Sequence, residues 1–362
     1  MQSPLGAQTT FNGRVCDYFS GCSYLGLNNH PEVFRAAEQA LAEYGLSTGT
    51  SRGGYGEHPL YDRLESAVNA MFGAEKMLYF PSGYLGMTLL LQGLAGRYER
   101  IFIDAEAHFS EWDGARTTGR EVAVFNHRDP AHLRELLRNC LKPGERPVIV
   151  SDGVFPISGE LPPLHEYVQL AEDWDGIVCL DDAHGGGAIG AHGRGCADHF
   201  GIESPRCFSG YTLSKAFGGF GGVIAGSQSM IDELESHSRV YVAASPIPLP
   251  VTAASAAAVE IARRQPELRQ KLWENVAFVR QGFRQLGWPV DDSPVPIVCL
   301  RRMPGMDLGK IKDALFKRDI CVAHVTTYSS TPVGGALRVA VFASHTRAQL
   351  ERLLEETRKI IA

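Results

Sequence analysis

Seven short apolar runs, separated by longer stretches with a helical pattern, constrain the fold of this chain more than any other feature. A strand that is apolar on both faces belongs in a sheet covered by helices above and below. The alternation therefore predicts an α/β fold whose central sheet has seven mostly parallel strands. The runs are KMLYF (76–80), RIFID (100–104), EVAVF (121–125), PVIVSDG (147–153), GIVCLDD (176–182), RCFSGYTL (206–213) and GGVIAGS (221–227).

The alternation of strand and helix patterns stops near Pro250, where a long helical region covers residues 252–287. A strand at 296–300, a helix at 309–319, two further strands (320–325 and 337–342) and a closing helix that begins near Thr346 follow it. Such a mixture predicts a small α+β domain. We therefore expect an N-terminal segment (1–45), a large α/β domain (46–250), and a linking helix with a small C-terminal α+β domain (251–362).

Composition limits the classes of function. The formal net charge of −6 argues against a nucleic-acid binder, which needs a basic face. Eight scattered cysteines without close spacing indicate neither a zinc knuckle nor a redox pair, and they favour a reducing cytoplasm. The first residues do not resemble a signal peptide, and no apolar stretch reaches the 18 or so residues of a membrane span. We expect a cytoplasmic protein.

The stretch GYTLSKAFGGFGG (210–222) sets one lysine, Lys215, among glycines. Lysine is rarely buried, because its ammonium loses hydration unless a partner or a chemical bond compensates. An imine with an aldehyde is such a bond. The alternative interpretation is a solvated surface lysine beside a glycine turn.

Polar residues follow several of the predicted strands, at the sheet edge where ligands of α/β proteins gather. Ser82, Gly83 and Tyr84 open a predicted helix and offer backbone N–H groups to an anion, although an ordinary N-cap explains them too. His108 follows the strand at 100–104, where a structural role is the alternative. Asp181 ends the strand at 176–182, and a carboxylate there can hold a heterocyclic nitrogen protonated.

Metal binding is a rival interpretation of the loop that follows Asp181. No recognised ligand spacing supports it. The residues concerned are Asp181, Asp182, His184, His192, Cys196 and His199.

Together, the lysine, the aspartate, the histidine and the anion-binding turn match the requirements of pyridoxal phosphate. Lys215 would bind the aldehyde as an imine, Asp181 would keep the pyridine nitrogen protonated, and His108 would stack on the ring. We predict pyridoxal 5′-phosphate as the cofactor and no metal.

A series of motifs then resembles the α-oxoamine synthases, which are fold-type-I pyridoxal phosphate enzymes. The resemblance extends from YLGL (24–27) to LRVAVFASH (337–345), and its strongest pair is DDAHG with TLSK. In order, the motifs are TGTSRGGYGEHPLYDRLE, FPSGYLGM, DAEAHFS, SDGVFPISG, LDDAHGGGAIGAHGRG and TLSKAFGGFGG.

This resemblance implies an acyltransferase that joins a small amino acid to an acyl thioester, with loss of carbon dioxide, to give an α-amino ketone. The thioester is an acyl-CoA or an acyl carrier protein, and the active unit is a homodimer with shared active sites. By residue, it implies the Schiff base and proton transfer for Lys215, a ring-oxygen donor in His184, phosphate contacts from Gly83, Tyr84 and Thr212, and the amino-acid carboxylate on Arg338. A strand-edge salt bridge is the alternative for Arg338.

Four departures from the family pattern bear on the substrates and the cofactor. Cys22 stands where the family has an asparagine that contacts the amino-acid carboxylate. Pro156 replaces a serine that bonds the ring oxygen, with Ser158 nearby. Ala244 falls where the partner subunit lends a hydroxyl to the phosphate, and we expect Ser245, which follows it, to bind the cofactor instead. The sequence also begins close to YLGL, without the longer N-terminal helix that helps family members bind acyl donors.

Other functions stay open at this point. A class I or II aminotransferase would use the same Lys215 and Asp181, because a fold alone does not fix the reaction. A Ser–Lys hydrolase on Ser214 and Lys215 is disfavoured, since adjacent side chains point apart. A catalytically inactive structural subunit is disfavoured because Lys215 is present.

Overall fold

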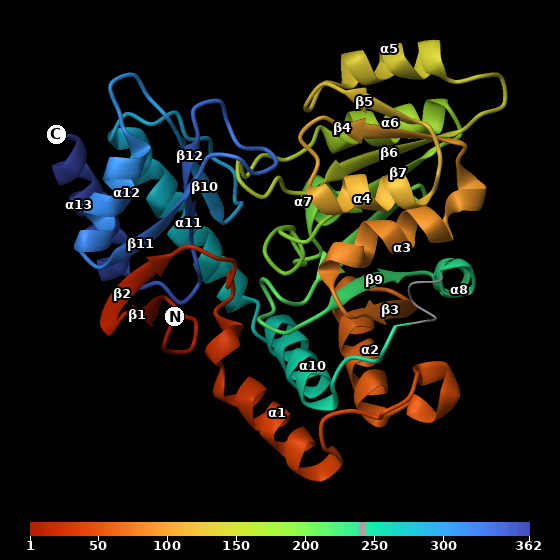
Figure 1. The fold of residues 1–362 in the computed structure, drawn as a ribbon, viewed down its shortest axis with the longest axis horizontal. Helices are drawn as coiled ribbons and strands as arrows, with labels where there is room; N and C mark the ends of the chain where they lie inside the picture. The colour runs from red at the N-terminus through yellow and green to blue at the C-terminus, as the bar shows by residue number, and fades with distance from the viewer. Residues whose placement is uncertain (239–243) are drawn as a thin grey trace.

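The computed structural model describes residues 1–238 and 244–362, which build two separate sheets with helices around them (Figure 1). The seven predicted central strands are all present, in the order β3-β9-β8-β7-β6-β4-β5. Only β9 runs antiparallel to its neighbours, so the prediction of a mostly parallel sheet is confirmed. The strands are β3 (Lys76–Phe80), β4 (Arg100–Asp104), β5 (Val122–Phe125), β6 (Pro147–Asp152), β7 (Ile177–Asp181), β8 (Cys207–Thr212) and β9 (Gly222–Gly226).

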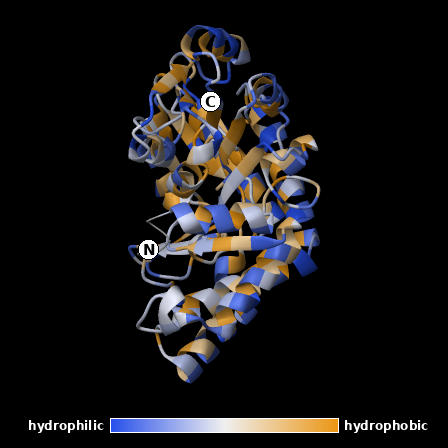
Figure 2. Ribbon diagram, turned by 90° about the vertical axis from the view of Figure 1, so that its right-hand side faces the viewer, coloured by the Kyte–Doolittle hydropathy of each residue, from blue (hydrophilic) through white to orange (hydrophobic). Residues whose placement is uncertain are grey.

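Helices cover both faces of this sheet. Helices α3 and α8 contact β3, β7, β8 and β9, whereas α5 and α6 contact β5, β6 and β7. Neighbouring residues of β4, Phe102 and Ile103, are fully buried in two different hydrophobic clusters, so this strand is apolar on both faces as predicted. Figure 2 shows the same pattern, with orange strands inside and blue helix faces outside. The helices are α2 (Pro59–Phe72), α3 (Gly86–Gly93), α4 (Phe109–Thr117), α5 (Pro130–Cys140), α6 (Leu164–Asp173), α7 (Cys196–Phe200) and α8 (Gln228–His237).

The second sheet joins the two ends of the sequence. Its order is β1-β2-β11-β12-β10, and β2 pairs in parallel with β11. The strands β10 (Ile297–Arg301), β11 (Ile320–Val325) and β12 (Ala336–Ala340) lie where the sequence predicts them. The prediction lacks β1 (Gln8–Phe11) and β2 (Arg14–Phe19), because these strands are short and their residues alternate only weakly in polarity.

The long helical region after Pro250 is two helices rather than one. Helix α10 (Leu249–Arg264) ends before Pro266, and α11 (Glu267–Gln285) begins after it. Proline lacks a backbone N–H and its ring clashes with the preceding turn, so it breaks the helix here. The closing helix α13 (Arg347–Ile361) starts as predicted, because Thr346 forms a capping box with Gln349.

The remaining described elements are further helices and short helical turns. Helix α1 (Pro31–Tyr44) packs on α10, and α12 (Leu308–Lys317) packs on α13 and β11. Short 3-10 turns cover Leu27–Asn29, Gly83–Leu85 and Ala95–Arg97, and a π-helical turn covers Arg52–Gly56.

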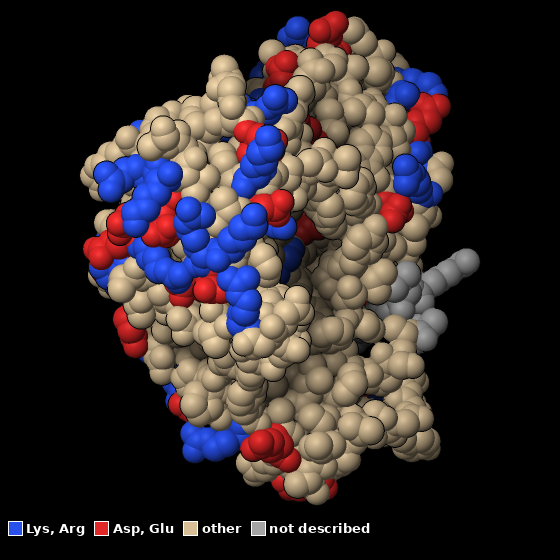
Figure 3. Space-filling model, turned by 60° about the vertical axis from the view of Figure 1, so that its left-hand side comes forward, with Lys and Arg blue, Asp and Glu red and all other residues tan. Residues whose placement is uncertain are grey.

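The surface carries mixed charge and is hollowed between the two sheet-containing parts (Figure 3). Around the small sheet, lysine and arginine alternate with aspartate and glutamate, as in the ion pairs Arg14–Asp319, Arg318–Glu356 and Arg352–Asp17. In the described parts of the chain, no helix is long and apolar enough to cross a membrane.

Candidate active site

One cavity of about 450 Å³ brings together ten of the eleven residues that the sequence analysis assigns to the cofactor and the amino-acid substrate. Its lining comes from both sheets, so the site exists only when the two parts of the molecule meet. The eleventh residue, Ser245, lines a different cavity. The ten are Cys22, Ser82, Gly83, Tyr84, His108, Asp181, His184, Thr212, Lys215 and Arg338.

The strand ends of the large sheet position most of these side chains. Asp181 is the last residue of β7, Lys215 lies three residues after β8, and His108 lies four residues after β4. Parallel strands present their carboxyl ends at one edge of the sheet, which is why residues far apart in sequence meet there. The small sheet contributes Arg338 from β12 on the opposite side of the cavity.

Lys215 is half-buried in this cavity, and the structure shows neither a hydrogen bond nor an ion pair for its Nζ within residues 1–238 and 244–362. Burial lowers the pKa of the Lys215 ammonium, although Cys22, Asp181 and Asp152 oppose the shift. A lower pKa increases the fraction of neutral amine, which is the nucleophilic form. The environment therefore suits a lysine that reacts with an aldehyde.

Asp181 is held by two donors. The hydroxyl of Ser110 donates to Oδ2 over 2.9 Å, and the amide of Ala183 donates to Oδ1 over 3.2 Å. His108 lies beside this carboxylate, with its own amide donating to Asp152 over 3.0 Å. Burial lowers the pKa of the His108 imidazole, an effect that Asp181 opposes. The site thus places an acceptor carboxylate next to an imidazole that is mainly neutral at neutral pH.

His184 is buried on another wall of the cavity. Its Nδ1 lies 2.6 Å from the hydroxyl of Tyr24, a residue near the start of the chain. Burial lowers the pKa of His184 well below its usual range, and the nearby Lys215 and Arg338 charges lower it further. His184 is therefore a neutral imidazole, with one N–H to donate.

Arg338 is buried, with 6% of its surface exposed, and its guanidinium bonds only to neutral groups. It donates to the carbonyls of Pro156 (2.7 Å) and Gly21 (3.0 Å), to the Tyr24 hydroxyl (3.3 Å) and to the Cys22 sulfur (3.6 Å). Strand β12 is paired on both sides, and no carboxylate of the described residues pairs with Arg338. The alternative prediction, that Arg338 forms a salt bridge at a strand edge, is therefore wrong.

A buried guanidinium without a counter-ion is costly, because its charge has lost its hydration. An anionic ligand that enters the cavity would remove this cost. Arg338 is therefore the strongest anion-binding signal that the site offers.

The loop after β3 has the features of a phosphate cradle. Ser82 caps the helical turn by accepting from the Tyr84 amide over 3.3 Å, so the N-cap interpretation is confirmed. A Cβ on Gly83 would lie 2.7 Å from Thr212, so only glycine allows this close approach of the loop to β8. The exposed hydroxyl of Ser214 bonds that of Thr212 over 2.8 Å beside the same loop. Backbone amides and two hydroxyls thus converge at one end of the cavity.

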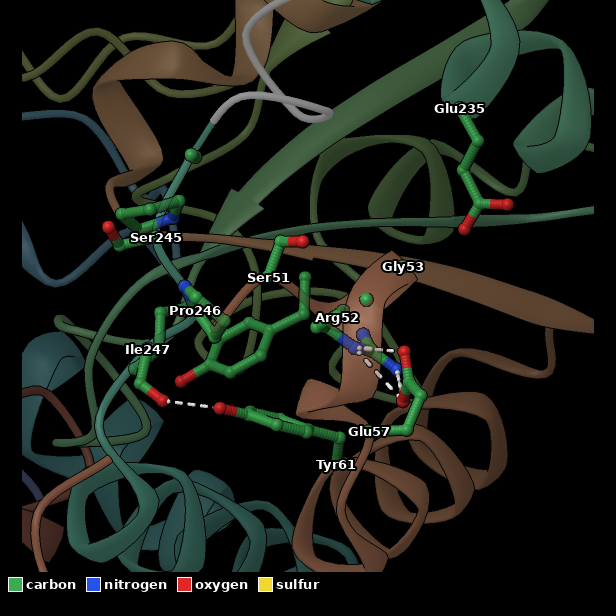
Figure 4. Close-up of a pocket in the computed structure, with 13 residues that line it drawn as sticks. Ser51, Arg52, Gly53, Glu57, Tyr61, Glu235, Ser245, Pro246 and Ile247 are labelled. Carbon is green, nitrogen blue, oxygen red and sulfur yellow. Dashed lines mark hydrogen bonds and ion pairs between the residues drawn. The ribbon is translucent and has the colours of Figure 1, made fainter. Parts of the chain in front are cut away.

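The two proposed substitutes for missing family hydroxyls lie outside this cavity. Ser158 is not among the lining residues, and its Oγ accepts from the Glu160 amide over 3.3 Å. Ser245 lines a second cavity of about 560 Å³ together with the glycine-rich segment at 51–54 (Figure 4). In that cavity Arg52 pairs with Glu57, and the Tyr61 hydroxyl donates to the Ile247 carbonyl over 2.7 Å.

The loop after Asp181 is held by its own hydrogen bonds. Asp182 accepts from the Cys196 amide over 2.6 Å, and burial raises the pKa of its carboxyl to about 7. His192 pairs with Asp198 over 2.9 Å. Among the described residues, no group of three or more His, Cys, Asp or Glu is arranged to hold a metal ion.

Four polar lining residues, Ser110, Asp152, Ser214 and Tyr328, were missed in the sequence analysis of the site. Asp152 ends β6, and Ser110 follows His108 in the first turn of α4 after β4, so the strand-end argument that found Asp181 and His108 extends to them as well. The sequence analysis names Ser214 only as the nucleophile of a disfavoured hydrolase, and not as a residue beside the phosphate loop. No sequence signal singles out Tyr328, because only the small sheet brings it to the cavity. Tyr24, the first residue of the YLGL motif, is fully buried and reaches the site through its bonds to His184 and Arg338.

Glu111, directly after Ser110, is fully buried, and in the described parts of the chain no side chain bonds its carboxyl; only the backbone of Asp181 approaches it. Burial raises the pKa of Glu111 well above its usual range, and Asp152, Asp181 and Asp104 raise it further. Glu111 is therefore a neutral carboxylic acid next to the site.

Comparisons with known proteins agree with this geometry. The profile of the family described as aminotransferase class I and II matches residues 19–356. A protein from Desulforudis audaxviator, named a putative 8-amino-7-oxononanoate synthase, is 35% identical over 360 residues, which are 99% of this chain and 93% of the relative. The serine palmitoyltransferase structure from Sphingomonas wittichii is 27% identical with a TM-score of 0.91, covering 99% of this chain and 90% of that one. A further structure, of SPT with a PLP internal aldimine, is 25% identical with the same TM-score and the same coverage.

Proposed function

This chain belongs to the α-oxoamine synthases within the class I and II aminotransferase family, and on that premise we propose which of its residues carry the reaction. The protein is a pyridoxal phosphate-dependent acyltransferase that condenses an amino acid with an acyl thioester, with decarboxylation, to give an α-amino ketone. The aminotransferase alternative is not favoured, because the similar proteins are named 8-amino-7-oxononanoate synthase and serine palmitoyltransferase rather than aminotransferase.

The residues present fit pyridoxal phosphate. The cavity offers an unpaired amine (Lys215), a carboxylate (Asp181) and a loop of amides and hydroxyls at Ser82–Tyr84. When bound, the cofactor supplies an aldehyde that condenses with amines and an electron-poor ring that stabilises negative charge at the amino acid's α-carbon. We assign Lys215 to the covalent attachment and to moving the α-proton, since its lowered pKa suits both tasks.

The other cofactor contacts follow from the walls of the cavity. Asp181 would hold the ring nitrogen protonated, and His108 would stack on the ring face. His184, whose Nδ1 faces Tyr24, retains its other ring nitrogen for donation to the ring oxygen. Thr212 would assist the Gly83 and Tyr84 amides at the phosphate; the contact of Gly83 with Thr212 supports this role.

The substrate assignment rests on Arg338, which is buried and for which residues 1–238 and 244–362 supply no carboxylate partner. Its planar fork matches a carboxylate better than a lysine would. We propose that Arg338 binds the carboxylate of the incoming amino acid beside Lys215. The sulfur of Cys22 accepts from this guanidinium over 3.6 Å, and a thiol is only a weak hydrogen-bond donor to a substrate carboxylate. We therefore propose a small amino acid that is recognised mainly by Arg338.

We further propose that two copies of the chain share their sites. Pro81 lines the second cavity while the adjacent Ser82 lines the first, so the two cavities lie at neighbouring residues. Ser245 and the segment at 51–54 stand in the second cavity, where they would face the partner's cofactor phosphate (Figure 4). Nearby, Leu46 is 70% exposed and Tyr55 fully exposed, as is typical of a surface that a partner covers.

Three further proposals concern the domain boundaries, the cellular compartment and the acyl donor. The chain divides at residues 46 and 251, although β1 and β2 pair with the C-terminal sheet. The protein works in the cytoplasm, which suits its eight unpaired cysteines. The acyl donor is a coenzyme A or carrier-protein thioester.

Borohydride reduction tests the central assignment. The purified protein with pyridoxal phosphate should be yellow, and reduction should bleach it and fix the cofactor on Lys215 in peptide mapping. Cofactor on another lysine would overturn the assignment of Lys215. Incubation with each amino acid in turn, followed by acyl thioesters, should then release free thiol and carbon dioxide for the true pair. Release of a keto acid without thiol would instead indicate an aminotransferase.

A further inference from the structure

Tyr328 stands at the opening of the cavity, in the segment between β11 and β12. It lines the cavity and is 41% exposed. Its amide donates to Oγ1 of Thr331 over 3.1 Å, and its ring packs edge-on against Phe109 with centroids 5.2 Å apart. Its hydroxyl lies 2.7 Å from Nε2 of His108. Contacts of the backbone, the ring and the hydroxyl therefore fix this phenol on the wall of the cavity.

The hydrogen bonds of His108 decide which partner donates in this contact. His108 is the N-cap of α4, and its Nδ1 accepts from the Ser110 amide over 3.2 Å. A backbone amide can only donate, so Nδ1 carries a lone pair and no proton. Burial lowers the pKa of His108, which leaves the ring neutral with its single proton on Nε2. His108 therefore donates to Tyr328, and the phenol oxygen accepts.

The hydrogen of the Tyr328 hydroxyl is left free by this arrangement. A phenol can donate one hydrogen bond while it accepts another. Within residues 1–238 and 244–362, no residue accepts from the Tyr328 hydroxyl. Burial raises the pKa of Tyr328, and the nearby carboxylates of Asp152 and Asp181 raise it further, so the phenol keeps its proton at neutral pH. Tyr328 thus offers an O–H donor at the opening of the cavity.

The proposed reaction needs a donor beside the carbonyl of the acyl thioester. When the α-carbon of the amino acid attacks this carbonyl, a C–C bond forms and the π electrons of the C=O bond move to oxygen. The C=O bond then re-forms, the C–S bond breaks, and its electron pair leaves on sulfur, which takes up a proton from water. A donor fixed beside the oxygen stabilises the charge that develops there and contributes roughly 100- to 1000-fold to kcat.

The stronger donors deeper in the cavity already have tasks in the proposed function. Arg338 binds the amino-acid carboxylate, His184 donates to the ring oxygen of the cofactor, and Lys215 holds the cofactor and moves the α-proton. The amides at 83–84 bind the phosphate. Tyr328 is the strong donor of the described lining that has no such task.

We propose that Tyr328 is a catalytic residue that donates a hydrogen bond to the carbonyl oxygen of the acyl thioester while the amino acid attacks it. This inference rests on the proposed function, which supplies the thioester and the attacking carbon. Tyr328 neither gains nor loses a proton in the step. The exposed rings of Tyr84 and Phe109 lie on either side of His108 at the same opening, where they offer apolar contact to the acyl chain.

Two rates measured on the same holoenzyme test this role. Tyr328→Phe keeps the ring that packs on Phe109 and removes only the hydroxyl. It should lower kcat for thiol release from acetyl-, hexanoyl- or palmitoyl-coenzyme A by roughly 100-fold, as expected for loss of one such donor. It should leave the exchange of the amino acid's α-hydrogen with deuterium oxide within about twofold, because that step involves no thioester. Val333→Ala changes a fully exposed residue of the same loop and should alter neither rate.

The pattern of the two rates separates the possible failures. Unchanged thiol release in Tyr328→Phe overturns the inference. Equal loss of both rates overturns it as well, because Tyr328 would then act on the cofactor through His108. An unaltered holoenzyme that exchanges no α-hydrogen of any amino acid contradicts the proposed function itself.

Isotope-edited infrared spectroscopy reads the hydrogen bond without turnover. The holoenzyme, without amino acid, is loaded with whichever of the three thioesters releases thiol fastest, labelled with ¹³C at its carbonyl. A hydrogen bond weakens the C=O bond, so the carbonyl band should lie at lower wavenumber in the unaltered enzyme than in Tyr328→Phe. Bands at the same wavenumber in both proteins overturn the inference.

Discussion

The hydroxyl of Tyr24 and Nδ1 of His184 lie 2.6 Å apart behind the wall of the cavity, although 160 positions separate them in the sequence. Arg338 donates to the same hydroxyl over 3.3 Å. Burial raises the pKa of Tyr24 well above its usual range, which keeps the phenol protonated. One phenol therefore accepts from the guanidinium and donates to the imidazole, so it links the proposed carboxylate site to the proposed ring-oxygen donor.

Tyr24→Phe should weaken both ends of this link. We expect KM for the amino acid to rise roughly fivefold, because Arg338 loses one neutral hydrogen-bond partner and His184 loses its orienting donor. Visible titration of the cofactor band with amino acid would measure the change. Tyr98→Phe, in which the lost hydroxyl bonds the Leu91 carbonyl away from the cavity, is the matched control. An unchanged KM would contradict the linking role of Tyr24.

Arg338→Lys should retain the positive charge but lose the planar fork. We expect amino-acid binding to weaken by about 1.5–3 kcal/mol, roughly 10- to 150-fold, with the cofactor still bound. Arg338→Ala should abolish the spectral response to amino acids. It should also lower stability, because the Pro156 and Gly21 carbonyls lose their donor. Equal amino-acid affinity in Arg338→Lys and the unaltered enzyme would place the carboxylate elsewhere.

Cys22→Asn should restore a side-chain amide next to Arg338. We expect tighter amino-acid binding, by up to about tenfold, since an amide donates a stronger hydrogen bond than a thiol. Isothermal titration of the holoenzyme would measure the affinity. Cys140→Asn changes a half-buried cysteine at the end of α5 that does not line the cavity, and it should have no effect on the affinity. Weaker binding in Cys22→Asn would mean that the thiol itself contributes to substrate choice.

Glu111→Leu should stabilise the fold above pH 5. The raised pKa keeps Glu111 protonated in the folded state while the unfolded chain ionises near its ordinary pKa of 4.5. The folded state then binds more protons than the unfolded one, so stability falls as pH rises, and removing the carboxyl abolishes this loss. We expect a gain of about 1–3 kcal/mol at pH 8 that shrinks as the pH falls below 4.5.

Chemical denaturation of Glu111→Leu at several pH values measures this gain. Glu111→Gln is the matched control, because it removes the titration but keeps a buried polar group. The leucine variant should therefore exceed it in stability. A leucine variant that is less stable at pH 8 would show that Glu111 has a partner which compensates its burial.

Much of the large sheet could be predicted because its signal is local. Runs such as RIFID and PVIVSD are apolar on both faces, and neighbouring residues such as Phe102 and Ile103 are indeed buried in separate clusters. The same locality placed Asp181, His108 and Lys215 at strand ends, where parallel strands bring them together. Proline at 266 was also visible in the sequence, yet the helical pattern on both sides of it concealed the break.

By itself, the sequence determined the seven buried strands, the loops after them and the chemical types of the side chains at their ends. Only the tertiary structure decided what surrounds those side chains. Pairing of β2 with β11 brings Tyr24 and Cys22 to Arg338 across more than 300 positions, and the β11–β12 segment carries Tyr328 to His108. The physical reason is that apolar periodicity depends on near neighbours, whereas the charge state and hydrogen bonding of a buried group depend on whichever distant residues the packing places beside it.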